Sequence, residues 1–227
     1  EEQLNQAERL AALGTMVAGV SHEVKNPLGI IQSTAELLGG MPDANENQKR
    51  LSGVIKEESG RLNNIVTKFL DFARPQVPFL QECHLEKILD KNLTFLQPEL
   101  EKRNIQVNDH VNGRPLLLHA DQELLYRALL NIFLNAIQAT PDGGSITIKV
   151  AEEKNSYRIE IQDTGRGINR ENVKKIFNPF FTTKEKGSGL GLSIVRKIIE
   201  GHRGTIAIES KEGEGTTVKI HLPLRGV

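Results

Sequence analysis

The chain has 227 residues, and its 29 lysines and arginines balance 29 aspartates and glutamates, so the formal net charge is zero. A balanced charge gives no electrostatic basis for binding nucleic acid or an anionic membrane, because such binders need an excess of positive charge. The single cysteine, Cys83, excludes an internal disulfide and a thiolate set for zinc, and no apolar run approaches the ~20 residues that span a bilayer.

The first 76 residues are predicted to form a helical hairpin. Apolar residues from Leu10 to Leu38 recur at spacings of three and four, as in a heptad seam, until Gly39–Asp43 ends the helix. A second apolar pattern runs from Leu51 to Ala73 and stops at Arg74–Pro78, because proline cannot continue the helical hydrogen bonds. The apolar surface of these helices is wider than a single helix–helix contact can bury. This favours a homodimer in which two hairpins form a four-helix bundle. Packing of the hairpin on the rest of its own chain is the alternative.

Residues 77–227 have the composition of an α+β two-layer sandwich. Helical patterns alternate with short runs of β character, and most of the last four runs are expected to pair as hairpins. Helices are predicted at about 85–103, 121–140, 171–177 and 190–200. Strands are predicted at Ile105–Val111, Leu116–His119, Ser145–Ala151, Tyr157–Gln162, Gly204–Glu209 and Thr216–Leu222.

The first candidate site lies on the first helix. At 100° per residue, His22 points away from the apolar seam, Asn26 lies one turn further on the same outward face, and Glu23 flanks them. Pro27 leaves the carbonyl of Glu23 without its usual partner, which costs about 3 kcal/mol and should bend the helix. A histidine or a charge on a helix is usually only solvated, so the grouping, rather than any one residue, indicates function.

The second candidate site is a polar stripe on the helix predicted at 121–140. That helix is apolar almost all round and therefore buried, yet Asn131, Asn135 and Gln138 follow one another at i, i+4 and i+7. Buried amides need hydrogen-bond partners, so the stripe either joins a structural polar network or lines a cavity.

The third candidate site follows the strand predicted at Tyr157–Gln162. Period-two alternation places Asp163 on the inward face with Ile159 and Ile161, where a carboxylate needs a donor such as the amino group of a purine.

These segments resemble the sequence boxes of sensor histidine kinases. Ser21-His-Glu-Val-Lys-Asn-Pro-Leu28 resembles the H-box, and Asn131-x-x-x-Asn135 resembles the N-box of the ATP-binding superfamily that also contains type II topoisomerases and heat-shock chaperones. The G1, F and G2 boxes follow in the family's order as Asp163-Thr-Gly-Arg-Gly167, Phe177-Asn-Pro-Phe-Phe181 and Gly187–Gly191, and Gly213-x-Gly-Thr216 resembles the last strand. Lys25-Asn-Pro27 and Asp71-Phe-Ala-Arg74-Pro75 are most similar to the nitrogen-regulatory type.

The resemblance implies a role for each residue of these boxes. His22 would be the phosphoacceptor, Glu23 its acid/base partner and Asn26 the residue that orients water for dephosphorylation of a response regulator. Asn135 would bind Mg²⁺, and Asp163 would bind adenine. The ATP site implied by the resemblance comprises Asn131, Asn135, Gln138, Asp163, Gly165, Gly167, Ile168, Phe181, Thr183, Lys184, Gly187, Ser188, Gly189, Leu190, Gly191 and Leu192.

We therefore expect a histidine-phosphotransfer hairpin (1–76) and an ATP-binding domain (77–227) that together phosphorylate His22 and then a receiver domain. We expect the fragment to be cytoplasmic and to make no membrane contact. In one alternative, it belongs to a longer parent protein that is anchored in the inner membrane. A second alternative is an ATP-hydrolysing conformational machine, although Asn131 stands where several such ATPases carry a glutamate base. A non-catalytic dimeric signalling module is a third.

Overall fold

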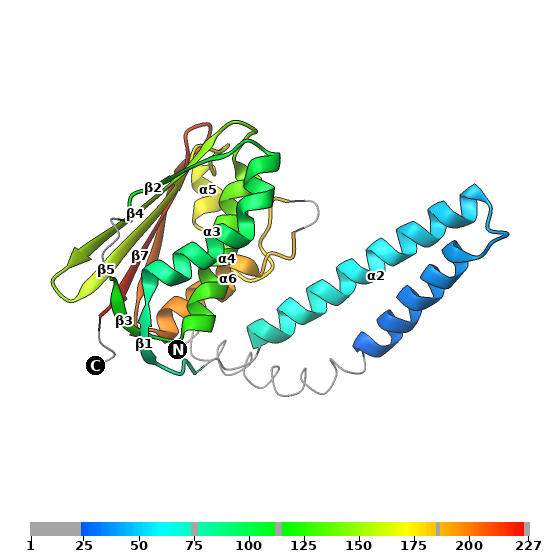
Figure 1. The fold of residues 1–227 in the computed structure, drawn as a ribbon, viewed down its shortest axis with the longest axis horizontal. Helices are drawn as coiled ribbons and strands as arrows, with labels where there is room; N and C mark the ends of the chain where they lie inside the picture. Colours follow the sequence, from blue (N-terminus) through cyan, green and yellow to red (C-terminus); the bar gives the residue numbers. More distant parts are fainter. Residues whose placement is uncertain (1–23, 74–76, 112–114, 185–186, 225–227) are drawn as a thin grey trace. The chain divides into compact units, whose positions relative to one another are not determined.

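The computed structural model describes residues 24–73, 77–111, 115–184 and 187–224. The chain divides into two compact units, Glu1–Pro75 and Gln76–Val227 (Figure 1). This division lies one residue from the predicted boundary. None of the helices within the described ranges is long and apolar enough to cross a membrane.

The first unit is a helical hairpin, as predicted. A helix over residues 24–40 is followed by α2 (Glu46–Ala73), and the earlier part of the predicted first helix lies outside the described residues. The second helix begins before the predicted Leu51 because Asn45 and Gln48 form a reciprocal cap. Gln48 N–H donates to Asn45 Oδ1 (2.9 Å), and Asn45 N–H donates to Gln48 Oε1 (2.8 Å). Two helical N–H groups are thereby satisfied at the start of α2.

Small residues line the contact between the two hairpin helices. Ala35 and Ser52 are buried, and a β-carbon placed at Gly39 would lie only 2.4 Å from Ser52 Oγ. Lys56 Nζ lies 2.7 Å from Glu36 Oε1 and adds an ion pair between the helices. The seam inside the hairpin is thus narrow, and most large apolar side chains are left outside it.

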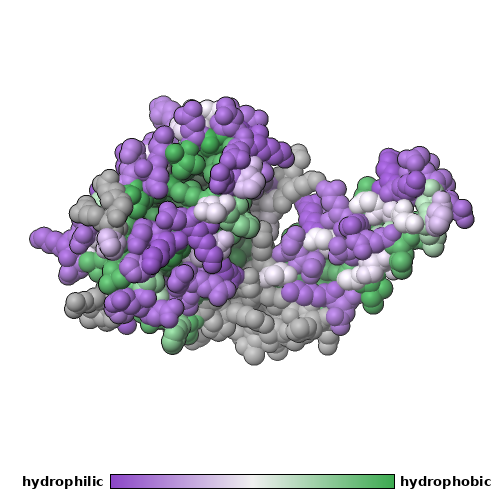
Figure 2. All heavy atoms as spheres, viewed as in Figure 1, coloured by the Kyte–Doolittle hydropathy of each residue, from purple (hydrophilic) through white to green (hydrophobic). Residues whose placement is uncertain are grey.

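Those outer apolar side chains form a surface on both helices, seen as green among purple in Figure 2. A soluble monomer rarely exposes so many large apolar side chains on so small a unit. The exposed set comprises Ile30, Ile31, Leu37, Leu38, Leu51, Val54, Ile55 and Leu62.

The second unit contains a five-stranded sheet of order β2-β4-β5-β7-β6. The hairpins β4–β5 and β6–β7 are antiparallel, which confirms the predicted pairing, and β2 joins β4 in parallel. The strands are β2 (Gln106–Asp109), β4 (Ser145–Glu153), β5 (Ser156–Asp163), β6 (Thr205–Lys211) and β7 (Gly215–Pro223).

Helices cover one face of this sheet and give the predicted two-layer α+β architecture (Figure 1). They are α3 (Leu85–Lys102), α4 (Gln122–Ala139) and α6 (Gly191–Gly201). The central helix α4 contacts α3, α6, β5 and β7, and its buried residues include Leu125, Leu129 and Phe133. The position of α4 between sheet and helices explains its nearly all-round apolar sequence.

Two elements differ from the sequence prediction. β1 (Gln81–His84) was not predicted; it pairs with β3 (Leu117–Ala120) in a separate two-stranded sheet, although the run Gln-Glu-Cys-His carries little strand signal. The helix predicted at 171–177 is the shorter α5 (Arg170–Val173), after which the chain turns. Pro179 disfavours helical backbone at the residue before it, and Phe180 takes a left-handed conformation (φ 66°).

Candidate functional site

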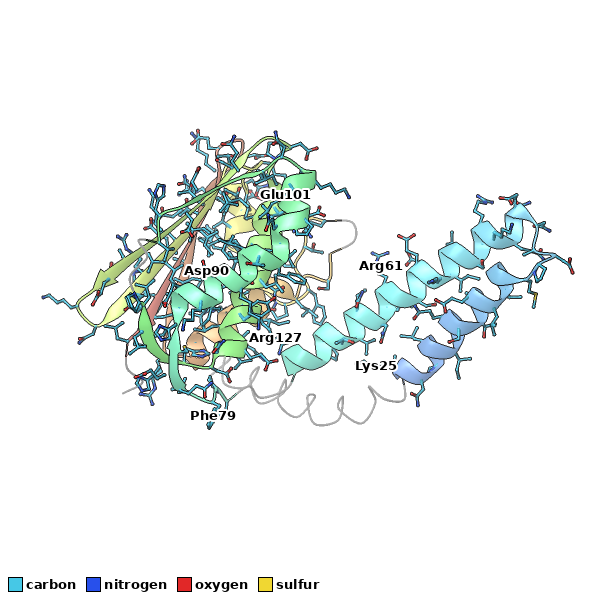
Figure 3. All side chains as sticks on the ribbon, viewed as in Figure 1. Lys25, Arg61, Phe79, Asp90, Glu101 and Arg127 are labelled. Carbon is cyan, nitrogen blue, oxygen red and sulfur yellow. The ribbon has the colours of Figure 1, made fainter. Side chains whose placement is uncertain are left out.

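Helix α4 carries the polar stripe that the sequence predicted. Asn131 and Asn135 are half-buried and Gln138 is exposed, so the stripe follows the accessible side of a helix whose other sides are buried. Asn131 Nδ2 donates to the carbonyl of Arg127, one turn earlier on α4 and labelled in Figure 3 (3.0 Å). The two later amides face a residue from a distant segment.

That residue is Lys184. Its Nζ donates to Asn135 Oδ1 (2.8 Å) and to Gln138 Oε1 (2.6 Å). The segment between α5 and α6 is therefore attached to the stripe by one ammonium group and two amide oxygens. An oxygen that accepts from an ammonium is also suited to a hard divalent cation, which prefers oxygen ligands.

Asp163 ends β5 on the inward face, as predicted, and is only 5% exposed. Burial raises the pKa of its carboxyl, and hydrogen bonds from the backbone N–H groups of Gly165 and Thr216 partly oppose that rise. The Gly165 bond to Asp163 Oδ1 is 2.8 Å long. Asp163 is thus a buried acceptor at the end of a strand, held by backbone donors.

Close backbone packing at glycines fixes the loop after Asp163. A β-carbon at Gly165 would lie 2.7 Å from the carbonyl of Ala139, the last residue of α4. Gly167 has φ +68°, and a β-carbon there would lie 2.0 Å from Lys211 O. The loop therefore lies against the C-terminal end of α4, so Asp163 and the stripe are brought to the same part of the unit.

The glycines before α6 are also closely packed. Gly189 has φ +68°, and a β-carbon there would lie 2.3 Å from the carbonyl carbon of Phe180. A β-carbon at Gly191 would lie 3.5 Å from Asn131 Oδ1, so the start of α6 lies beside the stripe.

The other predicted site residues vary in exposure. Leu190 is fully buried and its carbonyl accepts from Ser193 Oγ (2.8 Å). Ile168 N–H donates to Ser210 Oγ (2.8 Å). Thr183 is exposed, whereas the remaining side chains, those of Phe181, Ser188 and Leu192, are half-buried; Gly187 N–H donates to the carbonyl of Lys184 (3.2 Å).

Sequence reasoning left Ser210 and Thr216 out of the site. Thr216 is buried and pairs with Asp163 across β5 and β7, and its hydroxyl lies 2.9 Å from Ser210 Oγ. Ser210 also receives the Ile168 N–H, so this hydroxyl pair supports the loop that follows Asp163. The Gly213-x-Gly-Thr216 pattern was the available signal.

The residues predicted to take part in phosphotransfer, His22, Glu23 and Asn26, belong to the first unit. His22 and Glu23 lie outside the described residues. Asn26 is exposed on the helix over residues 24–40, and Leu28, two residues on, is buried at 9% exposure. This agrees with the predicted outward face, since two helical residues differ by about 200°.

A buried histidine supports the beginning of α4. Asp121 caps the helix by accepting from Glu123 and Leu124 N–H, and its own N–H donates to His202 Nε2 (2.9 Å). The second carboxylate oxygen of Asp121 accepts from the backbone of Phe79 (3.1 Å), whose side chain is exposed (Figure 3). The segment that enters the second unit is thus bonded to the cap of α4.

Comparison with known proteins places both units in described families. Residues 120–226 match the family described as histidine kinase-, DNA gyrase B-, and HSP90-like ATPase, and residues 12–78 match the His Kinase A (phospho-acceptor) domain. The chain is 35% identical over 224 residues to the sensor histidine kinase ZraS of Escherichia coli K12, and 37% identical over 225 residues to AtoS of the same organism. Each match covers 99% of this chain, but only 48% of ZraS and 37% of AtoS.

Solved structures agree with these families. The catalytic domain of histidine kinase ThkA is 33% identical, with a TM-score of 0.60 over 64% of this chain and 96% of that one. ThkA in complex with the response regulator protein TrrA is 32% identical, with a TM-score of 0.71 over 99% of this chain and 65% of that chain. ShkA in complex with AMPPNP, at 24% identity and a TM-score of 0.80, shares the fold over 94% of this chain and 46% of that chain.

Proposed function

This chain belongs to the sensor histidine kinase family, and from that premise we propose that it transfers the γ-phosphoryl group of ATP to His22 and then to an aspartate of a response regulator. One observation carries the proposal. The buried carboxylate of Asp163 and the amide–ammonium cluster of Asn135, Gln138 and Lys184 lie at the same end of α4. That arrangement offers an acceptor for a base and a polar, cationic place for phosphates on one scaffold.

In the nucleotide site, Asp163 accepts a hydrogen bond from the adenine amino group. The carboxylate is buried and held by Gly165 N–H on one oxygen, which leaves acceptor capacity for a ligand donor. The absence of side chains at Gly165 and Gly167 lets this loop pack closely against the carbonyls of Ala139 and Lys211, which holds Asp163 in place for the base. Phosphates then lie toward Lys184 and the N-terminus of α6, where backbone N–H groups and the helix dipole favour negative charge.

Asn135 is the residue that would hold Mg²⁺. Its side-chain oxygen accepts from the Lys184 ammonium, so a cationic partner already suits this oxygen. Mg²⁺ is bound in nucleotide sites by few protein oxygens together with phosphates, and it would neutralise phosphate charge there. The donor set therefore fits the metal.

In the phosphotransfer unit, His22 is the nucleophile and Glu23 holds one ring nitrogen so that the other can attack. An imidazole suits this task because its ordinary pKa of about 6.5 leaves a free nitrogen at neutral pH. Asn26 has a different role: its exposed amide can orient water to release phosphate from the regulator.

The hairpin, residues 1–76, is proposed to dimerise through its exposed apolar surface, while residues 77–227 form the catalytic domain. Leu62 is 49% exposed, and Leu62→Glu would bury an unpaired charge in the four-helix bundle. Sedimentation should then show a monomer. Asn64, an exposed residue on the other side of α2, supplies the control Asn64→Glu, which should remain dimeric. If the parent protein sediments as a monomer at micromolar concentration, the proposed four-helix dimer is wrong.

The alternative function, an ATP-hydrolysing machine of the same superfamily, is less well supported than a histidine kinase. The amide of Asn131 donates to its own helix and cannot act as a base toward water. We therefore expect slow hydrolysis of ATP and retention of the phosphoryl group on the protein.

Incubation with γ-labelled ATP tests the proposal directly. The parent should acquire an acid-labile label, and His22→Gln should abolish it while ADP affinity stays within about twofold, because the substituted side chain binds no part of the nucleotide. Persistent labelling of His22→Gln would refute the assignment of the phosphoacceptor.

A further inference from the structure

The guanidinium group of Arg103 is bound to the C-terminal end of α4. Arg103 follows α3, and its Nη1 donates to the carbonyl of Ile137, while Nη2 donates to the carbonyl of Thr140 (2.7 Å). Its Nε donates to Asp142 Oδ1 (2.9 Å), and its carbonyl accepts from Gly143 N–H (3.0 Å). One residue therefore joins the end of α3 to the last turn of α4 and to the following turn.

These contacts satisfy groups that a helix leaves unpaired. The last four carbonyls of a helix have no partner within it, and a positive charge there also interacts favourably with the helix dipole. The Arg103 side chain is 25% exposed, so its bonds to the two carbonyls are partly screened from water, whereas Asp142 is 76% exposed and its ion pair is weak. The contact with the helix end is thus the stronger of the two.

The loop after Asp163 is also bonded to this last turn of α4. Arg166 N–H donates to the carbonyl of Ala139 (3.1 Å), two residues beyond Ile137. Thr164 N–H donates to the carbonyl of Ser145 (3.1 Å), and Ser145 N–H donates to Thr164 Oγ1 (2.9 Å). A displacement of the end of α4 would therefore move the loop after Asp163 and change the positions of Asp163 and Gly165.

We propose that Arg103 is a positioning residue of the nucleotide site, which acts by fixing the end of α4 against which the adenine-binding loop packs. The inference rests on the proposed function, because it assumes that this loop binds adenine. Arg103 itself does not touch the nucleotide. Its loss should weaken nucleotide binding by changing where Asp163 and Gly165 lie, while the phosphoryl transfer step itself is unaffected.

The test compares Arg103→Ala and Arg103→Lys with a matched control in the full chain. Arg158 is the control, because it forms ion pairs with Glu153 (3.0 Å) and Glu160 (2.8 Å) on the sheet and bonds to nothing on α4 among the described contacts. The dissociation constant of ADP would be measured by calorimetry below the unfolding temperature of every variant. The KM for ATP, kcat and the unfolding midpoint would be measured on the same samples.

We expect Arg103→Ala to weaken ADP binding and raise the KM for ATP by about tenfold, equivalent to about 1.4 kcal/mol, with kcat nearly unchanged. Arg103→Lys should recover part of the affinity, because one ammonium can reach a single carbonyl. Methylguanidinium, at a concentration that leaves the parent folded, should restore ADP binding to Arg103→Ala, and an equal concentration of sodium should not. Arg158→Ala should bind ADP like the parent.

Two different outcomes distinguish a failure of the Arg103 inference from a failure of the proposed function. If folded Arg103→Ala and Arg103→Lys melt at lower temperature but bind ADP as tightly as the parent, Arg103 is only a stabilising residue and this inference is wrong. If the parent itself binds no ADP, the proposed function falls as well.

Discussion

The Nζ atom of Lys184 lies 2.8 Å from Asn135 Oδ1 and 2.6 Å from Gln138 Oε1. Asn135 is also the residue proposed to hold Mg²⁺. In the proposed site, the ammonium of Lys184 and Mg²⁺ would therefore compete for one oxygen atom, and a nucleotide that brought its metal would displace the lysine from Asn135. The displaced ammonium would then interact with phosphate.

Lys184→Met should change how strongly ADP binding depends on Mg²⁺. Without the ammonium, the metal meets a free Asn135 oxygen, so the ratio of ADP affinity with Mg²⁺ to that with a chelator should increase by roughly fivefold, about 1 kcal/mol. Calorimetric titrations under both conditions measure this ratio. Lys149→Met, at an exposed position of β4, is the control. An unchanged ratio in Lys184→Met would show that the lysine and the metal do not share the oxygen.

Asp163→Asn should stabilise the nucleotide-free protein and weaken its binding of adenine nucleotides. Burial raises the pKa of Asp163, so ionisation of this carboxyl group costs the folded state stability relative to the unfolded chain. Asparagine keeps an acceptor for Gly165 N–H but loses the charge-assisted bond to adenine, worth about 1.5–3 kcal/mol, which predicts at least tenfold weaker ADP binding. If ATP and GTP bound the parent equally well, the adenine role of Asp163 would be wrong.

The same substitution has a predicted pH dependence. Because the folded-state pKa of Asp163 lies above the ordinary value of 3.8, its contribution to stability is full below that value and is lost as the pH rises through the folded-state pKa. The urea midpoint of Asp163→Asn should therefore exceed that of the parent by a margin that grows from about pH 4 upward. A constant margin would mean that Asp163 titrates normally.

Local patterns predicted most of the second unit, because its signals are short-range. The period-two alternation of β5 correctly placed Asp163 on the buried face, and the 3.6-residue pattern predicted α4. The contact of Lys184 with Asn135 could not be predicted, since those residues are 49 positions apart in the chain and meet only through the packing of the fold. The same holds for Arg103 and the end of α4.

Lack of local signal also explains the elements that the sequence missed. β1 is polar and is held by its pairing with β3, which no pattern within Gln81–His84 reveals. The early start of α2, in contrast, is indicated by the Asn45-x-x-Gln48 capping pattern, which precedes the first residue of the apolar periodicity.

Acid should destabilise the second unit through His202. Nδ1 of His202 lies 2.7 Å from the carbonyl of Ile198 and must carry the proton, so Nε2 accepts from Asp121 N–H. Burial lowers the pKa of His202, although the Ile198 carbonyl and the Asp121 charge oppose this. Its stabilising contribution is therefore full above the ordinary value of 6.5 and is lost as the pH falls through the folded-state pKa.

His202→Gln removes this titration while it keeps an acceptor and a donor. Below about pH 6.5 the unfolding midpoint of the parent should fall more steeply than that of His202→Gln. His110→Gln, at an exposed position, should follow the parent. Parallel curves for the parent and His202→Gln would mean that another group governs the acid response.

Asn26→Ala should separate the two activities proposed for the hairpin. His22 must act as a nucleophile in the kinase reaction, whereas dephosphorylation of a regulator needs only an oriented water. The exposed amide of Asn26 can donate to and accept from such a water but has no evident part in transfer from ATP. We expect autophosphorylation within about threefold of the parent and at least tenfold less phosphatase activity toward the phosphorylated regulator in the presence of nucleotide. Ser33→Ala, two turns along on the same exposed side, should keep both activities. If Asn26→Ala kept both activities, the side chain of Asn26 would only be solvated on the helix beside Pro27. If both activities fell equally, Asn26 would instead maintain the local helix geometry.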